Sequence, residues 1–196
     1  ELPAAVFDDA TAVLCGAMNE VSRTSKEELK LLKKGCEILD LSFQAVVERL
    51  KPGVRECDLW AAAEQAILTN GGWYAHNMYV ASGPNPTFPR APASLLRLEA
   101  GDVAVFEVSA FYGGVSPQIS YALSLGEPDA KVGEMFEFCR DLYYYSLAEL
   151  EKKRTFLDIE TSLVRRIHRA GYEPETPQIH RYNMSIVMPM ESAPQQ

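Results

Sequence analysis

One carboxylate interrupts an apolar segment of the chain, and its surroundings favour chemistry. Glu107 lies within residues 103–108 (VAVFEV), which follow the turn signal Gly101-Asp102. A short apolar run bounded by glycine turns predicts a buried strand. Burying a carboxylate is costly unless it is paired, hydrogen-bonded or faces a cavity, so Glu107 is a candidate for proton transfer or ligand binding. The alternative is an edge strand that leaves Glu107 in water.

The residues that follow predict the rest of a hairpin. Tyr112-Gly113-Gly114 forms a turn signal, and residues 115–125 read as a return strand that ends at Gly126-Glu127-Pro128. A carboxylate in the apolar wall of such a hairpin tends towards a raised pKa, which suits proton transfer near neutral pH.

Helices on either side of the hairpin would have to hold it in place. Ser25 and Glu28 form a capping box that predicts a helix to about Leu50. Its apolar face is predicted to consist of Leu29, Leu32, Cys36, Leu39, Phe43, Val46 and Leu50. Further helices are predicted over about 58–70, 129–153 and 156–170. In the segment 129–153 the stripe predicted to be core consists of Met135, Phe138, Leu142, Tyr145 and Leu150.

The chain also carries a weak internal repeat. Each half of the sequence predicts the same series of elements: a long helix, a turn, a shorter helix that ends at a glycine, and a strand. This repetition predicts a duplicated structural unit. The matching positions lie 100 residues apart: Leu50, Asp58, Leu59, Ile67 and Gly71 recur as Leu150, Asp158, Ile159, Ile167 and Gly171.

Composition narrows the classes of function. With 196 residues of which 47% are hydrophobic, the chain can bury one sizeable core. A net charge of −8 argues against nucleic acid or an anionic membrane as the main partner. The sequence has no signal peptide and no apolar run near the ~18 residues of a membrane span, so we expect a cytoplasmic protein. Four scattered cysteines without CxxC spacing are predicted to be buried free thiols: Cys15, Cys36, Cys57 and Cys139.

Three segments together resemble the creatinase, prolidase and methionine aminopeptidase family, whose fold is called pita bread. In the hairpin, Gly101-Asp102 and Gly126-Glu127-Pro128 fall in register with the pattern of that family. Two aspartates of the pattern bind a pair of divalent metals in the family. Glu107 stands in place of the first aspartate and Gln118 in place of the second, while Tyr121 replaces an arginine.

In the other two segments, other residue types stand at most of the positions where the family has histidines. Residues 79–85 (YVASGPN) resemble a segment followed by a substrate-contacting histidine, which is matched here by Arg90. Residues 179–186 (IHRYNMSI) resemble a segment with two histidines, matched by His180 and Met184, and Glu191 matches a further histidine. Methionine is a poor ligand for hard divalent ions, so the resemblance with these replacements implies no bound metal and no other cofactor.

For the fold, the resemblance implies the α+β pita-bread class with a pseudo-two-fold helix–helix–strand repeat. Residues 1–24 would be the tail of a small N-terminal domain or a linker. Residues 25–196 would be a catalytic-type domain truncated at its C-terminal end. The family relationship also implies a homodimer, without nucleic acid or membrane as a partner.

For function, the resemblance assigns catalysis to Glu107 and His180. Substrate binding is assigned to Arg90, Gln118, Asn183, Glu191 and His76. The favoured hypothesis is metal-independent hydrolysis of a C–N bond in a small amino-acid-, amide- or peptide-like substrate, because the creatinase branch works without metals. One alternative is a catalytically inactive pita-bread domain that binds peptide or protein. The other is an Xaa-Pro-type metalloaminopeptidase.

Overall fold

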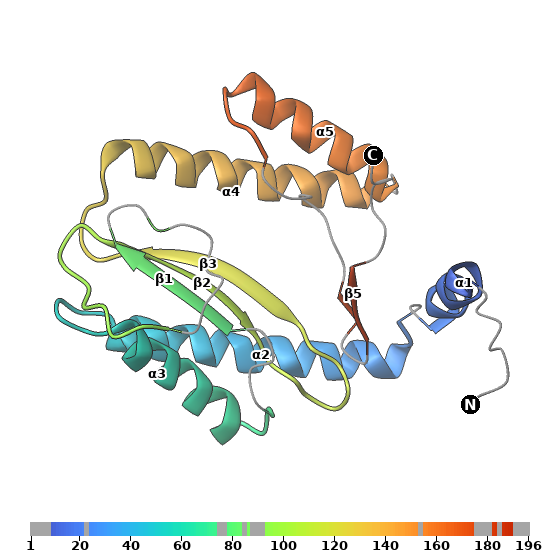
Figure 1. The fold of residues 1–196 in the computed structure, drawn as a ribbon, viewed down its shortest axis with the longest axis horizontal. Coiled ribbons are helices and arrows are strands. Elements are labelled where there is room, and N and C mark those ends of the chain that lie inside the picture. The colour runs from blue at the N-terminus through green and yellow to red at the C-terminus, as the bar shows by residue number, and fades with distance from the viewer. Residues whose placement is uncertain are drawn as a thin grey trace, which may run out of the picture.

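The computed structural model describes residues 9–21, 24–73, 78–83, 86, 93–152, 155–174, 182–183 and 186–189. The helices are α1 (Thr11–Val21), α2 (Lys26–Arg49), α3 (Glu56–Thr69), α4 (Ala130–Glu151) and α5 (Phe156–Arg169). The strands are β1 (Met78–Gly83), β2 (Val103–Ser109), β3 (Gln118–Ser124), β4 (Tyr182–Asn183) and β5 (Ile186–Pro189). Figure 1 shows α2 and α3 on one side of the β1–β3 sheet and the α4–α5 pair on the other.

The predicted hairpin is confirmed, with β2 at the centre of its sheet. The strand order is β1-β2-β3 and both pairings are antiparallel. The interpretation of β2 as an edge strand is therefore wrong. The return strand begins at Gln118, later than predicted, because Tyr112 and Val115 pair with each other across Gly113 and Gly114. These two glycines have φ values of 58° and 92°, a backbone region that glycine adopts without strain.

The core lies between this sheet and the α2–α3 pair. Ala104, Phe106, Val108 and Ala110 point to the helices and are fully buried. They pack with Ile38 and Val46 of α2 and with Leu59, Ala63 and Ile67 of α3. Burial of apolar area on this side of the sheet is the main driving force that fixes the hairpin on the helices.

Helix α2 begins as predicted, but its buried face is rotated from the prediction. Ser25 Oγ accepts a hydrogen bond from Glu28 N, and Glu28 Oε2 accepts one from Ser25 N, which completes the capping box. Leu29 and Cys36 are exposed, whereas Gly35 and Ser42 are buried beside the predicted Leu39 and Val46. At Gly35 the hairpin approaches α2 closely, because a Cβ atom there would lie 2.7 Å from Pro117 Cγ.

The internal repeat predicted from the sequence is present in the helix pairs. Arg55 N donates to Asp58 Oδ2 at the start of α3, and Thr155 N donates to Asp158 Oδ2 at the start of α5. Both helices end at a glycine with positive φ, 85° at Gly71 and 82° at Gly171. The same capping bonds therefore begin and end the second helix of each half.

Helices α4 and α5 differ from the prediction in their exposure. Met135 and Leu150 were predicted to be core, yet each side chain is 42% exposed. Among the described elements α4 packs chiefly against α5, with the Tyr145 ring 3.8 Å from the Arg166 guanidinium carbon, so its apolar stripe is only partly covered.

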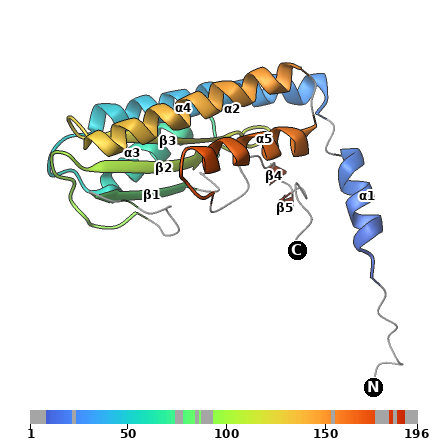
Figure 2. The ribbon, with the colours of Figure 1, turned by 90° about the horizontal axis from the view of Figure 1, so that it is seen from above.

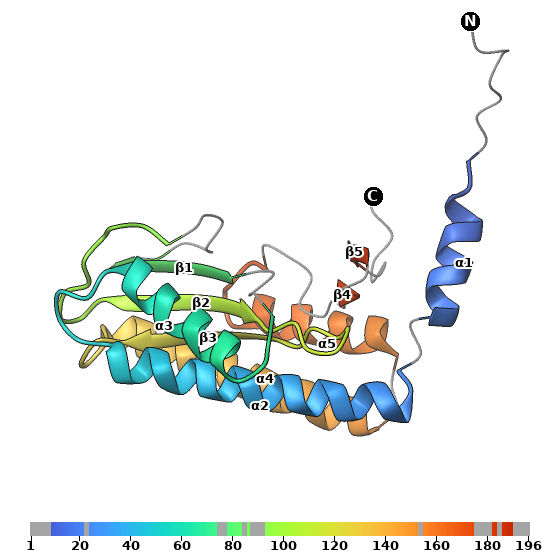
Figure 3. The same ribbon diagram turned by 90° about the horizontal axis from the view of Figure 1, so that it is seen from below.

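Three further points complete the fold. The cysteines are free as predicted but not buried, because Cys36 and Cys139 are exposed and Cys15 and Cys57 are half-buried. Figures 2 and 3 show α1 apart from the sheet and its helices, so α1 does not position the hairpin. Within the described residues no helix has the length and apolarity that crossing a bilayer requires.

Candidate active site

The candidate site occupies the face of the sheet that turns away from α2 and α3. Side chains alternate between the two faces of a strand, so Phe106 and Val108 point to the core and Glu107 points to the other face. In β2 the core-facing residues are fully buried, whereas Glu107 is half-buried. In Figure 1 this second face looks towards the side on which α4 and α5 lie.

Glu107 is engaged by Gln118 across the hairpin. In the register of the hairpin Ser109 pairs with Gln118 and Glu107 with Ser120, so Gln118 is the diagonal neighbour of Glu107 on the same face. The Gln118 Nε2 group donates a short hydrogen bond to Glu107 Oε1. An ionised carboxylate only accepts hydrogen bonds, so this contact fixes the orientation of the Gln118 amide. The pair is held on two rigid strands rather than on loops.

Further polar side chains share this face and were missed in the sequence analysis. Tyr79 of β1 and Ser120 of β3 lie directly opposite Glu107 on its two sides. Ser109, two positions after Glu107, is 3% exposed on the same face. The period of two along a strand would have identified Ser109 from Glu107 and Ser120 from Gln118. Tyr79 could not be found in that way, because the pairing of β1 with β2 is not local.

The described donor atoms on this face were compared with what a metal site requires. Within the described part of the chain, no three His, Cys, Asp or Glu residues come together in a group that could hold a metal ion. Gln118 turns an N–H rather than an oxygen towards Glu107, and an N–H offers no lone pair to a cation. The chemistry open to this pair is proton transfer by the carboxylate and hydrogen bonding by the amide.

Tyr121 lies on the opposite face of β3 from Gln118 and Ser120. It pairs with Phe106, and the two rings stack with centroids 4.9 Å apart. The Phe43 ring of α2 meets Tyr121 edge-on at 4.7 Å. Burial raises the pKa of the Tyr121 phenol. Tyr121, which the sequence analysis matched to an arginine of the family, is therefore part of the core and takes no part in the candidate site.

The remaining residues predicted for the site cannot be placed beside Glu107. Asn183 belongs to β4, where it pairs with Ile186 of β5, and its side chain is outside the described part of the structure. Four others lie outside the described residues: His76, Arg90, His180 and Glu191.

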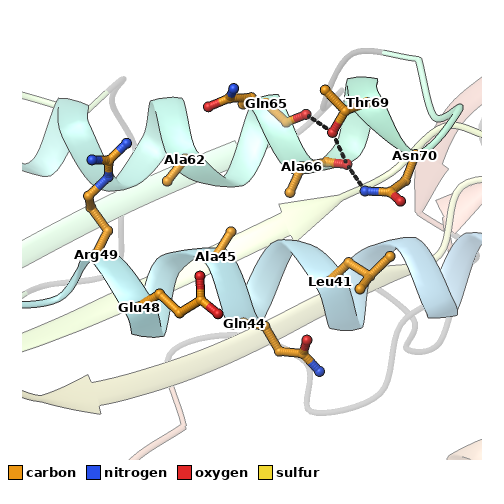
Figure 4. Close-up of a pocket in the computed structure, with 10 residues that line it drawn as sticks. All are labelled: Leu41, Gln44, Ala45, Glu48, Arg49, Ala62, Gln65, Ala66, Thr69 and Asn70. Carbon is orange, nitrogen blue, oxygen red and sulfur yellow. Dashed lines mark hydrogen bonds between the residues drawn. The ribbon is translucent and has the colours of Figure 1, made fainter.

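A surface pocket lies on the other side of the molecule. It has a volume of about 490 Å³ and is lined by α2 and α3 residues, including Glu48, Arg49 and Gln65. Figure 4 shows these side chains on the helices in front, with the sheet behind them. The pocket is therefore separated from Glu107 by the helices and the core, and it does not contribute to the candidate site.

Comparisons with known proteins place these features in a family context. Residues 30–191 match the model of metallopeptidase family M24. An Xaa-Pro dipeptidase of Pyrococcus furiosus is 28% identical over 149 residues, which are 76% of this chain and 43% of that protein. An Xaa-Pro dipeptidase of Pyrococcus horikoshii is 32% identical over 114 residues, or 58% of this chain and 32% of that protein.

Solved structures agree with the fold. The prolidase from Pyrococcus furiosus superposes with a TM-score of 0.67 and 25% identity, covering 80% of this chain and 47% of that one. The X-Pro aminopeptidase from Thermotoga maritima gives a TM-score of 0.71 with 24% identity over 80% of this chain and 45% of that one. The predicted α+β pita-bread fold is thereby confirmed. The chain spans less than half of the length of these relatives.

Proposed function

The chain belongs to metallopeptidase family M24, and we propose that it is a hydrolase of this family that cleaves a C–N bond of a small peptide-like substrate without a bound metal. The observation that carries the proposal is the hydrogen bond from Gln118 Nε2 to Glu107 Oε1. The family name implies bound metal, but a carboxylate paired with an amide N–H does not fit two divalent ions, which require lone pairs from oxygen or nitrogen. We therefore assign the chemistry to the side chains themselves.

The proposed reaction needs a group that moves a proton from the attacking water to the leaving nitrogen. Water adds its oxygen to the carbonyl carbon, the C–N bond breaks, and the leaving nitrogen takes up a proton. Glu107 accepts the proton of the attacking water and passes it to the nitrogen. Gln118 holds the carboxylate in one orientation, and the hydroxyl groups of Tyr79 and Ser120 lie on the same face for hydrogen bonds to the substrate.

Other residues enter the proposal from the sequence. His180 is assigned as a second proton-transfer group, and Arg90, with a guanidinium suited to a carboxylate, as a substrate anchor. Asn183, Glu191 and His76 are assigned to substrate binding. The homodimer and the cytoplasmic location expected from the sequence belong to the same proposal. The substrate class is suggested by the relatives, which include Xaa-Pro dipeptidases.

The deciding experiment measures turnover and metal content on the same preparation. The protein is purified without chelator, its metal content is measured by elemental mass spectrometry, and hydrolysis of alanyl-proline is followed with and without EDTA. We expect turnover that EDTA does not lower and that Glu107→Gln reduces by about 10²- to 10⁴-fold. Glu127→Gln, in the exposed turn after β3, is the matched control and should retain activity.

Two outcomes would overturn the proposal in different ways. Stoichiometric metal together with activity that EDTA abolishes would show an Xaa-Pro-type metallopeptidase. Alanyl-proline binding measured by calorimetry, without any turnover, would show a pita-bread domain that serves as a binding module.

A further inference from the structure

A second buried carboxylate, outside the candidate site, ties together three separate parts of the chain. Glu56, the first residue of α3, is 5% exposed. Its Oε1 accepts hydrogen bonds from Ser82 N and Ser82 Oγ, both at 2.8 Å. Its Oε2 accepts bonds from Ser94 N at 2.9 Å and Ser94 Oγ at 2.6 Å. Four hydrogen bonds thus hold this one carboxylate.

The arrangement satisfies the carboxylate without a cation. Burial by itself would raise the pKa of Glu56, but the hydrogen bonds from Ser94 and Ser82 outweigh it and leave the pKa lowered. The neighbouring charges have other partners, since Arg55 binds Asp58 and Arg97 donates to the Gly53 carbonyl. The negative charge of Glu56 is therefore stabilised by hydrogen bonds from two serines, Ser82 and Ser94.

The two serines lie at opposite ends of the connection between β1 and β2. Ser82 is the last residue but one of β1, and Ser94 begins the segment that leads to β2. Backbone bonds continue this attachment, since Cys57 N donates to Ser94 O at 3.0 Å and Glu56 N donates to Leu96 O at 3.1 Å. The residues between the two serines include Arg90. Both ends of this connection are thus fixed to the start of α3.

We propose that Glu56 is a positioning residue, which clamps Ser82 and Ser94 to the start of α3 and so fixes the end of β1 relative to the candidate site. β1 is the strand that carries Tyr79 opposite Glu107. Tyr79 is three residues before Ser82, a distance of about 10 Å along a strand. The clamp acts through backbone position and touches no substrate. Its effect on substrate rests on the proposed function, whereas the clamp itself does not.

The test of the clamp is residue-resolved amide hydrogen exchange of Glu56→Gln. A glutamine has one acceptor oxygen, so its NH₂ group must face the N–H of one serine and leave that amide without an acceptor. We expect exchange at Ser82 or Ser94 to become at least about tenfold faster, while the amide of Ile38 in the core changes little. Glu64→Gln, on the same helix and bonded to Trp60 Nε1, is the matched control. Unchanged exchange at both serines, or equal acceleration at Ile38, would overturn the clamp.

The consequence for substrate is tested by kinetics on the same variants. A positioning role predicts that Glu56→Gln raises KM for alanyl-proline about tenfold with a smaller change in kcat, and that Ser82→Ala and Ser94→Ala do so to a lesser extent. A loss of folded protein alone would lower the apparent kcat and leave KM unchanged, which would refute the positioning role. If the wild-type protein shows no turnover, the proposed function fails. In that case the hydrogen-exchange experiment still tests the clamp. The effect of the variants on substrate is then measured as the Kd of alanyl-proline instead of KM.

Discussion

Replacing Gly35 by alanine tests how closely α2 approaches the candidate site. A Cβ atom at Gly35 would lie 2.7 Å from Pro117 Cγ and 2.9 Å from Pro117 Cδ. Both atoms belong to a ring that is bonded to the backbone, so they cannot move aside as the end of a flexible side chain does. Pro117 directly precedes Gln118, so the contact bears on the position of the Glu107 partner.

Two opposing effects decide whether Gly35→Ala raises or lowers the free energy of unfolding. Alanine in place of glycine inside a helix stabilises by about 1 kcal/mol. Overpacking a tightly packed site costs about 1–3 kcal/mol, because the helix or the hairpin has to shift. We therefore expect Gly35→Ala to lower the free energy of unfolding by about 1 kcal/mol. Gly133→Ala in α4 is the control, because its Cβ would meet nothing within 4 Å, and it should stabilise by about 0.5–1 kcal/mol.

The assay is urea unfolding of Gly35→Ala, of the control Gly133→Ala, of Pro117→Ala and of the double variant Gly35→Ala/Pro117→Ala. We expect the double variant to regain part of the lost stability through relief of the contact, which a double-mutant cycle quantifies. Hydrolysis of alanyl-proline by Gly35→Ala should fall as well, since a shift of Pro117 moves Gln118 relative to Glu107. If Gly35→Ala stabilises the protein as much as Gly133→Ala does, the close approach of α2 to the hairpin is refuted.

Three further predictions concern buried or paired polar groups. Tyr121→Phe should leave the urea midpoint unchanged or raise stability by up to about 1 kcal/mol, because no hydrogen-bond partner of the Tyr121 hydroxyl is found among the described residues; a loss above 2 kcal/mol would contradict this. The folded-state pKa of Glu56 lies below its usual 4.5, so its contribution is complete above that pH and is lost as the pH falls through the lower value. The stability difference between wild type and Glu56→Gln should therefore shrink in acid unfolding titrations below about pH 4.5, and a constant difference would oppose the assignment. Gln118→Glu places a second carboxylate against Glu107, so Mn²⁺ should raise the Tm of this variant and not that of the wild type; equal shifts would show that Gln118 does not exclude the ion.

Much of the local structure could be predicted from the sequence. The capping box of Ser25 and Glu28, the glycine turn at Gly113-Gly114 and the strand around Glu107 were all predicted and are present. Each depends on hydrogen bonds or φ values within a few residues, and these are determined by the local sequence. The repeat of α3 in α5 was also visible, because the same caps are needed wherever such a helix begins and ends.

Other features depended on contacts between distant segments. The sequence placed Leu29 and Cys36 on the buried face of α2, but Gly35 and Ser42 are buried instead, and Gly35 lies against Pro117 of the hairpin. Periodicity gave an apolar stripe in α4, but it did not show that the described elements leave Met135 and Leu150 partly exposed. A stripe shows which side of a helix is apolar, and only the neighbouring elements determine whether that side is covered.

The sequence by itself determined the family and the hairpin that carries Glu107 and Gln118. Only the tertiary structure decided that β2 is the central strand, that Gln118 donates to Glu107, and that Tyr121 turns to the core. It alone showed Glu56 between Ser82 and Ser94, which lie 26 and 38 positions away in the chain. Strand order, register and the partners of a buried charge arise from long-range packing, whereas turns and caps arise from neighbouring residues.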